Sequence, residues 1–342
     1  MRLITTLFAI IWITMSLFAG CEKKEEAGAG AGAGGAAQSN GKRKVVIGFV
    51  AKSQSNQVFQ AAHAGARDAA KELGPRYNCD VEVRILTPTD EDPTKQAEAI
   101  EALAREGADG IAVACSEANT LTVAIDKAIS QGTHVMCFDS DAPASKRFAY
   151  YGTDDITCGR SVLRELAKAM SGAGTIAILA GNQSAPNLQL RVAGVREELK
   201  NHPNIKELNN GNGVFYHQET PEKAAEAVMN AQNANPQITG WAMVGGWPLF
   251  TADALKWSPG QVKVVSVDAL PAQLNYLKSG HVEVLLAQDC YGWGTKSVEI
   301  LLDKIVHNKQ PPDVRVIDPL TRVTKENADE YGQKWDKWLG RK

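Results

Sequence analysis

Two aspartates occupy positions that point to binding chemistry. Asp139 directly follows the apolar run 136–138, and Asp268 directly follows the run 265–267. Both runs predict buried strands, and ligands of open α/β sheets bind beyond the carboxyl ends of the strands. We therefore expect both carboxylates to face a ligand. The alternative for Asp139 is a structural role as a helix cap or turn residue.

The sequence carries no recognisable pattern for catalysis or metal binding. The histidines and cysteines show no metal-ligand spacing and no nucleophile partner, and neither a P-loop nor a nucleophile elbow is present. Gly30, Gly32 and Gly35 match a dinucleotide fingerprint by letter, but no strand precedes them. We expect no cofactor, no metal and no enzymatic activity.

Length and composition favour two ordinary globular domains. The chain has 342 residues, of which 44% are apolar and 22% charged, and its formal net charge is −2. No basic cluster with interleaved aromatic residues is present, so nothing favours nucleic acid as a partner.

The first residues predict export. Arg2 precedes the apolar run 3–18, which is shorter than the roughly 20 residues of a membrane span. Ala19, Gly20 and Cys21 follow, so residues 1–20 predict a signal peptide. The ending resembles a bacterial lipobox, which predicts lipidation of Cys21 and a membrane-anchored protein of the periplasm or cell envelope. Ordinary cleavage and an uncleaved anchor are the alternatives.

An Ala/Gly-rich tether and then two α/β lobes are expected after Cys21. Residues 21–44 contain nothing that could bury a core. From residue 45 onward strands and helices alternate, which predicts parallel sheets with helices on both faces. Strands are expected at 45–50, 81–86, 110–114, 134–138, 175–179, 212–217, 240–244, 262–267 and 281–288. Helices are expected at 58–73, 93–106, 120–130, 157–170, 188–201, 221–233, 250–257, 271–279 and 298–307.

The fold class predicted is therefore α/β, with two doubly wound parallel-sheet lobes joined by a multi-strand hinge. The N-terminal lobe is assigned to residues 45–150 plus 291–317. The C-terminal lobe and tail are assigned to residues 151–290 plus 318–342.

Several fragments, in this order and spacing, resemble one family. They include Ile47-Gly48-Phe49-Val50, Gly107-Ala108-Asp109-Gly110-Ile111, Phe138-Asp139-Ser140-Asp141-Ala142-Pro143, Tyr151-Gly152-Thr153-Asp154-Asp155 and Ala287-Gln288. Roughly residues 45–320 resemble the ribose-type periplasmic binding proteins of sugar ABC importers. The resemblance implies a periplasmic binding protein-like I fold and a monomer that closes its lobes around a small monosaccharide-like ligand. It also implies delivery of that ligand to the membrane subunits of an ABC permease.

The resemblance also implies a set of ligand-binding residues. Carboxylates and amides would pair hydroxyl groups, an arginine fork would bind oxygens, and aromatic faces would pack on C–H groups. The set is Asn56, Phe59, Asp139, Ser140, Gln183, Arg191, Trp247, Asp268 and Gln288.

Alternatives stay open for part of this set. Phe59 could belong to a helix core, Arg191 to a solvated helix face, and Trp247 to packing between the lobes. Val58, Ser140 and Gly245-Gly246-Trp247 depart from the pattern of ribose binders, so the identity of the sugar stays open.

A second function fits the same fold. A protein of this kind could instead present a sugar or a furanosyl signal to a chemoreceptor or sensor kinase.

Overall fold

The computed structural model describes residues 41–340. The predicted signal peptide, the lipidation of Cys21, the glycine fingerprint and most of the predicted tether lie outside these residues. Among the described residues, no helix combines the length and the apolar character that crossing a membrane requires.

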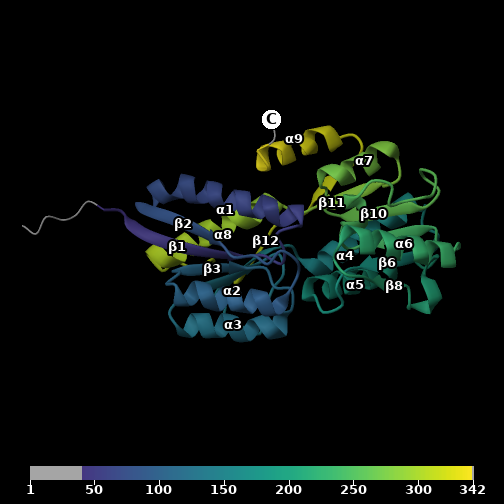
Figure 1. Ribbon diagram of the computed structural model, residues 1–342. Helices are drawn as coiled ribbons and strands as arrows, with labels where there is room; N and C mark the ends of the chain where they lie inside the picture. The colour runs from purple at the N-terminus through teal and green to yellow at the C-terminus, as the bar shows by residue number, and fades with distance from the viewer. Residues whose placement is uncertain (1–40, 341–342) are drawn as a thin grey trace, which may run out of the picture. The chain divides into compact units, whose positions relative to one another are not determined.

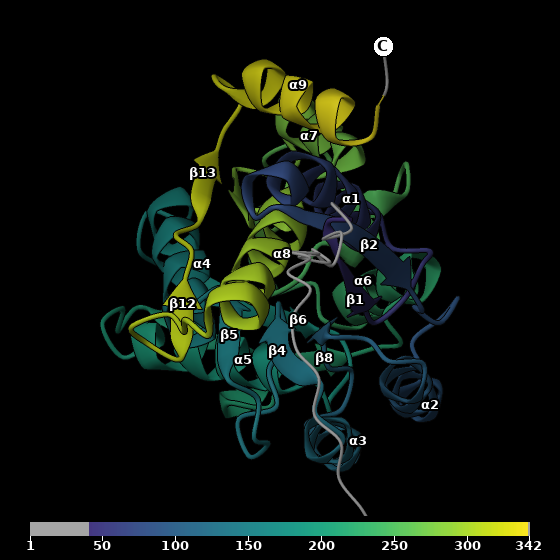
Figure 2. The same cartoon turned by 90° about the vertical axis from the view of Figure 1, so that its left-hand side faces the viewer.

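The first sheet is built mainly from the first half of the chain (Figure 1). Its order is β12-β5-β4-β3-β1-β2, and the neighbouring strands are parallel. The strands are β1 (Arg43–Val50), β2 (Cys79–Ile85), β3 (Gly110–Val113), β4 (His134–Phe138), β5 (Ala149–Gly152) and β12 (Arg315–Ile317). The helices α1 (Gln57–Arg76) and α8 (Cys290–His307) cover one face, and α2 (Pro93–Arg105) and α3 (Ala118–Ser130) cover the other (Figure 2).

The second sheet repeats this architecture. Its order is β13-β11-β10-β9-β6-β7, with β8 pairing with β6 beyond the part of β6 that pairs with β7. The strands are β6 (Gly174–Ala180), β7 (Ile205–Glu207), β8 (Val214–Tyr216), β9 (Gly240–Met243), β10 (Lys263–Val267), β11 (Val284–Ala287) and β13 (Thr321–Val323). Only the pair of β11 with β13 is antiparallel among the described strands of this sheet. The helices are α4 (Asp155–Ala169), α5 (Pro186–Leu199), α6 (Pro221–Ala234) and α7 (Pro271–Ser279).

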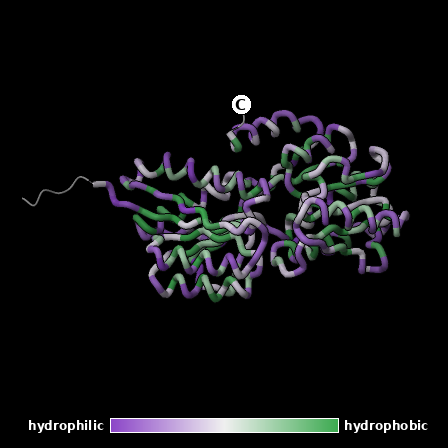
Figure 3. Tube along the Cα trace, viewed as in Figure 1, coloured by the Kyte–Doolittle hydropathy of each residue, from purple (hydrophilic) through white to green (hydrophobic). Residues whose placement is uncertain are grey.

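The apolar strands explain this layered arrangement. Most strand residues are buried, as is expected of parallel strands that carry helices on both faces. Figure 3 shows the apolar residues gathered along the strands and on the inner sides of the helices. The predicted α/β class with two parallel-sheet lobes is confirmed. The lobe boundaries and the movement about a hinge stay predictions.

Some short elements carry no clear sequence signal. The strands β5, β7, β12 and β13 were not predicted. The last three have only three residues each, including at least one charged side chain, so no apolar run marks them. The last helix, α9 (Ala328–Trp338), buries Tyr331 and Trp335, and its Trp338 ring stacks on Tyr291 at 5.7 Å between the centroids.

Two predicted elements were wrong in detail. A helix over 250–257 is not formed, because Asp253 adopts φ 58° and the Ala254 N–H donates to the Tyr276 hydroxyl. A 3-10 turn, η2 (Trp247–Phe250), precedes it instead. The helix expected to end at residue 73 ends later, at Arg76, because Pro75 stands in the last turn, where its missing N–H removes only one helical bond.

Candidate functional site

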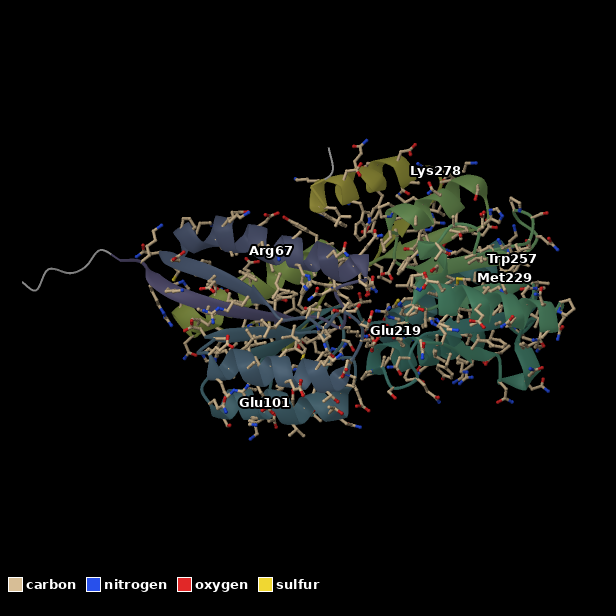
Figure 4. All side chains as sticks on the ribbon, viewed as in Figure 1. Arg67, Glu101, Glu219, Met229, Trp257 and Lys278 are labelled. Atoms are coloured by element: carbon tan, nitrogen blue, oxygen red, sulfur yellow. The ribbon has the colours of Figure 1, made fainter. Side chains whose placement is uncertain are left out.

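Two neighbouring cavities lie at the carboxyl ends of the strands. The larger one has a volume of about 560 Å³ and is lined by loops that follow β1, β2, β6 and β8. The smaller one has a volume of about 30 Å³, close to the space of a single water molecule. Both are lined by Lys52, Asn56, Phe59 and Glu219, so they adjoin. Glu219 is labelled in Figure 4.

Seven of the nine predicted ligand-binding residues line the smaller cavity. They are Asn56, Phe59, Asp139, Arg191, Trp247, Asp268 and Gln288. Gln183 lines only the larger cavity. Ser140 lines neither cavity, because it is fully buried with its hydroxyl 3.4 Å from the Asn187 amide oxygen. The structure therefore brings most of the predicted set together, and the ligand contacts themselves stay predictions.

The two aspartates reach the cavity through the same backbone conformation. Asp139 follows β4 with φ 55°, and Asp268 follows β10 with φ 67°. Residues other than glycine seldom adopt this left-handed conformation, and aspartate tolerates it better than most. A strained backbone conformation lowers the stability of the fold, and such conformations cluster at functional sites. Its occurrence at two equivalent strand ends therefore points to a site of function.

A buried network joins Arg191, Gln288 and Asp268. The Arg191 guanidinium donates to the Gln288 amide oxygen at 2.8 Å and to Asp155 at 2.9 Å. The Gln288 amide nitrogen donates to the Asp268 carboxylate at 2.9 Å. Arg191 is 3% exposed, which excludes the alternative of a solvated helix face. These bonds hold all three side chains in fixed orientations beside the cavity.

Gln288 also connects the two sheets. The hydroxyl of Thr153, which follows β5 of the first sheet, donates to the Gln288 amide oxygen at 3.1 Å. Gln288 itself follows β11 of the second sheet. A change in the spacing of the sheets would therefore disturb the network that holds Arg191.

Aromatic rings form the walls of the smaller cavity. The rings of Phe59 and Trp293 lie 6.0 Å apart, and the Trp247 ring meets the His217 ring edge-on at 5.1 Å. Trp247 and Phe59 are 6% and 4% exposed, so each ring packs against protein as well as lining the cavity. Phe59 and Trp247 can therefore both pack against the protein and contact a ligand.

Asn56 has a structural role in addition to its place in the cavity. It is the N-cap of α1, and its side-chain oxygen accepts a hydrogen bond from the Val58 N–H at 3.1 Å. This bond fixes the amide, whose nitrogen keeps its two donors for a ligand.

The sequence model of the periplasmic binding protein domain matches residues 47–309. The chain belongs to the periplasmic binding protein family. The family expected from the sequence is confirmed.

Similar proteins with curated descriptions cover part of the chain. The xylitol-binding protein of Mycolicibacterium smegmatis is 25% identical over 198 residues, which are 57% of this chain and 56% of that protein. The ribose import binding protein of Bacillus subtilis is 22% identical over 158 residues, which are 46% of this chain and 50% of that protein. This periplasmic binding protein thus spans about half the length of the curated relatives it matches.

One similar solved structure covers more of this chain than the curated relatives do. An ABC transporter solute-binding protein from Burkholderia graminis, in complex with D-arabinose, is 25% identical with a TM-score of 0.77. The match covers 84% of this chain and 97% of that chain.

Charged residues that the sequence prediction missed also line the cavities. Lys52 follows β1 and is 3% exposed, Glu91 follows β2, and Glu219 follows β8 of the second sheet. Lys52 could have been found by applying the strand-end rule to β1 as it was applied to β4. Glu91 and Glu219 lie several residues beyond their strands, so the same rule would not have selected them.

These charges alter one another's protonation. Burial alone would lower the pKa of Lys52, but Glu219, Asp139 and Glu91 outweigh it and raise that pKa. Burial, with Glu219 nearby, raises the pKa of Glu91 to about 7. Burial likewise raises the pKa of Asp139 to about 6, against the opposing effect of Lys52 and Arg191.

The chemistry of the site fits a polyhydroxylated ligand. Carboxylates accept from hydroxyls, amides and cations donate to oxygens, and aromatic faces pack on C–H groups. Among residues 41–340, no three His, Cys, Asp or Glu side chains gather as metal ligands would.

Proposed function

We propose that this periplasmic binding protein captures a small sugar or sugar alcohol between its two lobes and delivers it to an ABC-type permease, without catalysing a reaction. The observation that carries the proposal is the buried group of Asp139, Arg191, Asp268 and Gln288 beside aromatic walls. Relatives described as binding xylitol, ribose and D-arabinose support a five-carbon ligand as the first to test.

Closure of the lobes would supply both affinity and selectivity. In such a mechanism the ligand binds one lobe, and the second swings over it and expels water. A buried hydroxyl then has to find a partner, and an epimer that leaves one unpaired loses about 1–3 kcal/mol. The buried carboxylates and the Arg191 fork are suited to that selection.

A thermal-shift screen of the full chain tests the proposal. The ligands are xylitol, D-ribose, D-arabinose, hexoses and nucleosides. A ligand at 100 times its Kd adds about 2.7 kcal/mol to the free energy of unfolding, so we expect an increase in Tm of a few degrees. Asp268→Asn should abolish the increase, whereas Lys71→Met on the exposed side of α1 should keep it. Well-folded, ligand-free protein that responds to no polyol would refute the proposal.

Transport, rather than signalling, is the second part of the proposal. Stimulation of the ATPase activity of a reconstituted permease by the ligand-loaded protein would support delivery. Binding to a chemoreceptor or sensor kinase domain, with no effect on a permease, would favour the signalling alternative. Anchoring through Cys21, the envelope location and the monomeric state are part of the same proposal.

A further inference from the structure

Lys52 is a buried cation without a partner of its own. It is 3% exposed, yet within the described part of the chain its ammonium forms no hydrogen bond or ion pair. It lines both cavities. Leaving a buried charge unpaired is costly, so a cation that faces a cavity in this way is placed for a ligand.

Asp139 also lines the smaller cavity and, like Lys52, is buried without a hydrogen-bond partner for its charged group within residues 41–340. Its side chain is 5% exposed and has no hydrogen-bond donor among the described residues. The remaining charged groups of the smaller cavity differ. Arg191 donates hydrogen bonds to Asp155 and Gln288, Asp268 accepts from the Gln288 amide, and Glu219 accepts from the Asn182 N–H. In the described part of the smaller cavity the charged groups left without a hydrogen bond are therefore one donor, Lys52, and one acceptor, Asp139, and in the adjoining cavity the buried Glu91 Oε1 also has no partner.

Carboxylates outnumber cations around Lys52. Glu219 lies opposite it, on a loop of the second sheet, and accepts a hydrogen bond from the Asn182 N–H at 3.2 Å. Glu91 and Asp90 line the same cavity. Arg191 is already neutralised by Asp155 at 2.9 Å, so Lys52 is the one cation left to balance several carboxylates in the described cavities.

We propose that Lys52 is a ligand-binding residue that determines specificity. Its ammonium donates to an oxygen of the ligand while Asp139 and Glu219 accept from hydroxyls, and the excess of carboxylates restricts the site to uncharged polyols and excludes sugar acids. The inference rests on the proposed function, because it names the class of polyol that the site accepts.

Calorimetric titration of the full chain tests the role of Lys52. The neutral probes are xylitol and D-arabinose, and the acidic probes are D-xylonate and D-arabinonate. Lys52→Met keeps the length of the side chain and should weaken binding of the neutral probe roughly 10- to 100-fold, the loss typical of one hydrogen bond to a charged group. The matched control Lys71→Met should bind as the wild type does. Equal affinity of Lys52→Met and wild type would overturn the inference.

Two further readouts separate direct contact from a structural effect. A monodeoxy derivative of the probe that lacks the oxygen bound by Lys52 should bind wild type and Lys52→Met equally. Since Lys52 lowers the pKa of Asp139, the lower pH limit of binding should move to higher pH in Lys52→Met. A loss that is the same for every deoxy derivative would assign Lys52 a structural role only.

Glu219→Gln tests the charge selection, and it does so even if Lys52→Met fails to fold. Wild type should bind the acidic probes at least about tenfold more weakly than the neutral ones. Glu219→Gln removes one carboxylate, so this discrimination should decrease. Wild type that binds the acids as well as the polyols would overturn the exclusion, whereas wild type that binds no probe at all would refute the proposed function instead.

Discussion

Asp139 shows how a binding site conflicts with stability at the scale of one residue. Its carboxylate is buried without a hydrogen-bond donor, and its backbone is left-handed at φ 55°. Burial raises its pKa from 3.8 to about 6. Above pH 6 the folded protein holds a carboxylate that the unfolded chain would hydrate better, so the charge lowers the free energy of unfolding.

Asp139→Asn should therefore stabilise the ligand-free protein while it weakens ligand binding. The expected gain is on the order of 1–3 kcal/mol above pH 6, from about 1.4 kcal/mol for each unit of pKa. The gain should disappear at about pH 3 and below, where the wild-type carboxyl is mostly protonated in both states. Urea unfolding at pH 3 and pH 7.5 measures this difference in stability. A variant less stable than wild type at pH 7.5 would contradict this account.

Helix packing fixes the binding residues at the scale of elements. Helices α4 and α5 touch backbone to backbone: a Cβ added at Gly159 would lie 1.9 Å from the Arg191 carbonyl oxygen, and one at Gly194 would lie 2.1 Å from that of Ile156. Arg191 lies in this contact, so the separation of the two helices sets where its guanidinium reaches. Helices α1 and α8 meet as closely at Gly294.

Gly194→Ala should consequently force α4 and α5 apart. Overpacking of this kind typically costs about 1–3 kcal/mol, and the backbone contact at 2.1 Å places this variant at the upper end; ligand affinity should decrease as Arg191 moves. The control is Gly332→Ala in α9, where the nearest atom is the flexible end of Leu274 at 3.3 Å, and where alanine favours the helix. Its stability should change by less than about 1 kcal/mol. Equal unfolding midpoints for the two variants would rule out the close contact.

At the scale of the whole molecule, the chain passes between the two sheets more than once. It does so between β5 and α4, between β11 and α8, and between β12 and β13. Several connections restrict relative movement to a few directions, which suits a hinge. Thr153 and Gln288 lie at two of these passages, and the Thr153 hydroxyl donates a hydrogen bond to the Gln288 amide oxygen at 3.1 Å.

Ligand binding should therefore make the protein more compact. Small-angle X-ray scattering of the full chain should show a smaller radius of gyration when the neutral probe is present at saturation. Asp268→Asn at the same probe concentration serves as the control and should show no change. An unchanged radius in the wild type, with binding shown by calorimetry, would exclude hinge closure.

The sequence determined the alternation of strands and helices, the family, and the positions of Asp139 and Asp268 at strand ends. These follow from local periodicity and from short motifs in order along the chain. The buried pairing of Arg191 with Gln288 did not follow from it, because Arg191 lies on helix α5 and Gln288 follows strand β11, far apart in the sequence.

Only the tertiary structure decided which charges share the cavity. Lys52 and Glu219 belong to different sheets, and no periodicity links residues so far apart. It also buried Ser140 behind Asn187, which lines the cavity in its place, and kept residues 250–257 irregular despite their apolar spacing. The physical reason is that burial and charge balance depend on what the surrounding elements bring to a place, whereas the sequence fixes only what each element can offer.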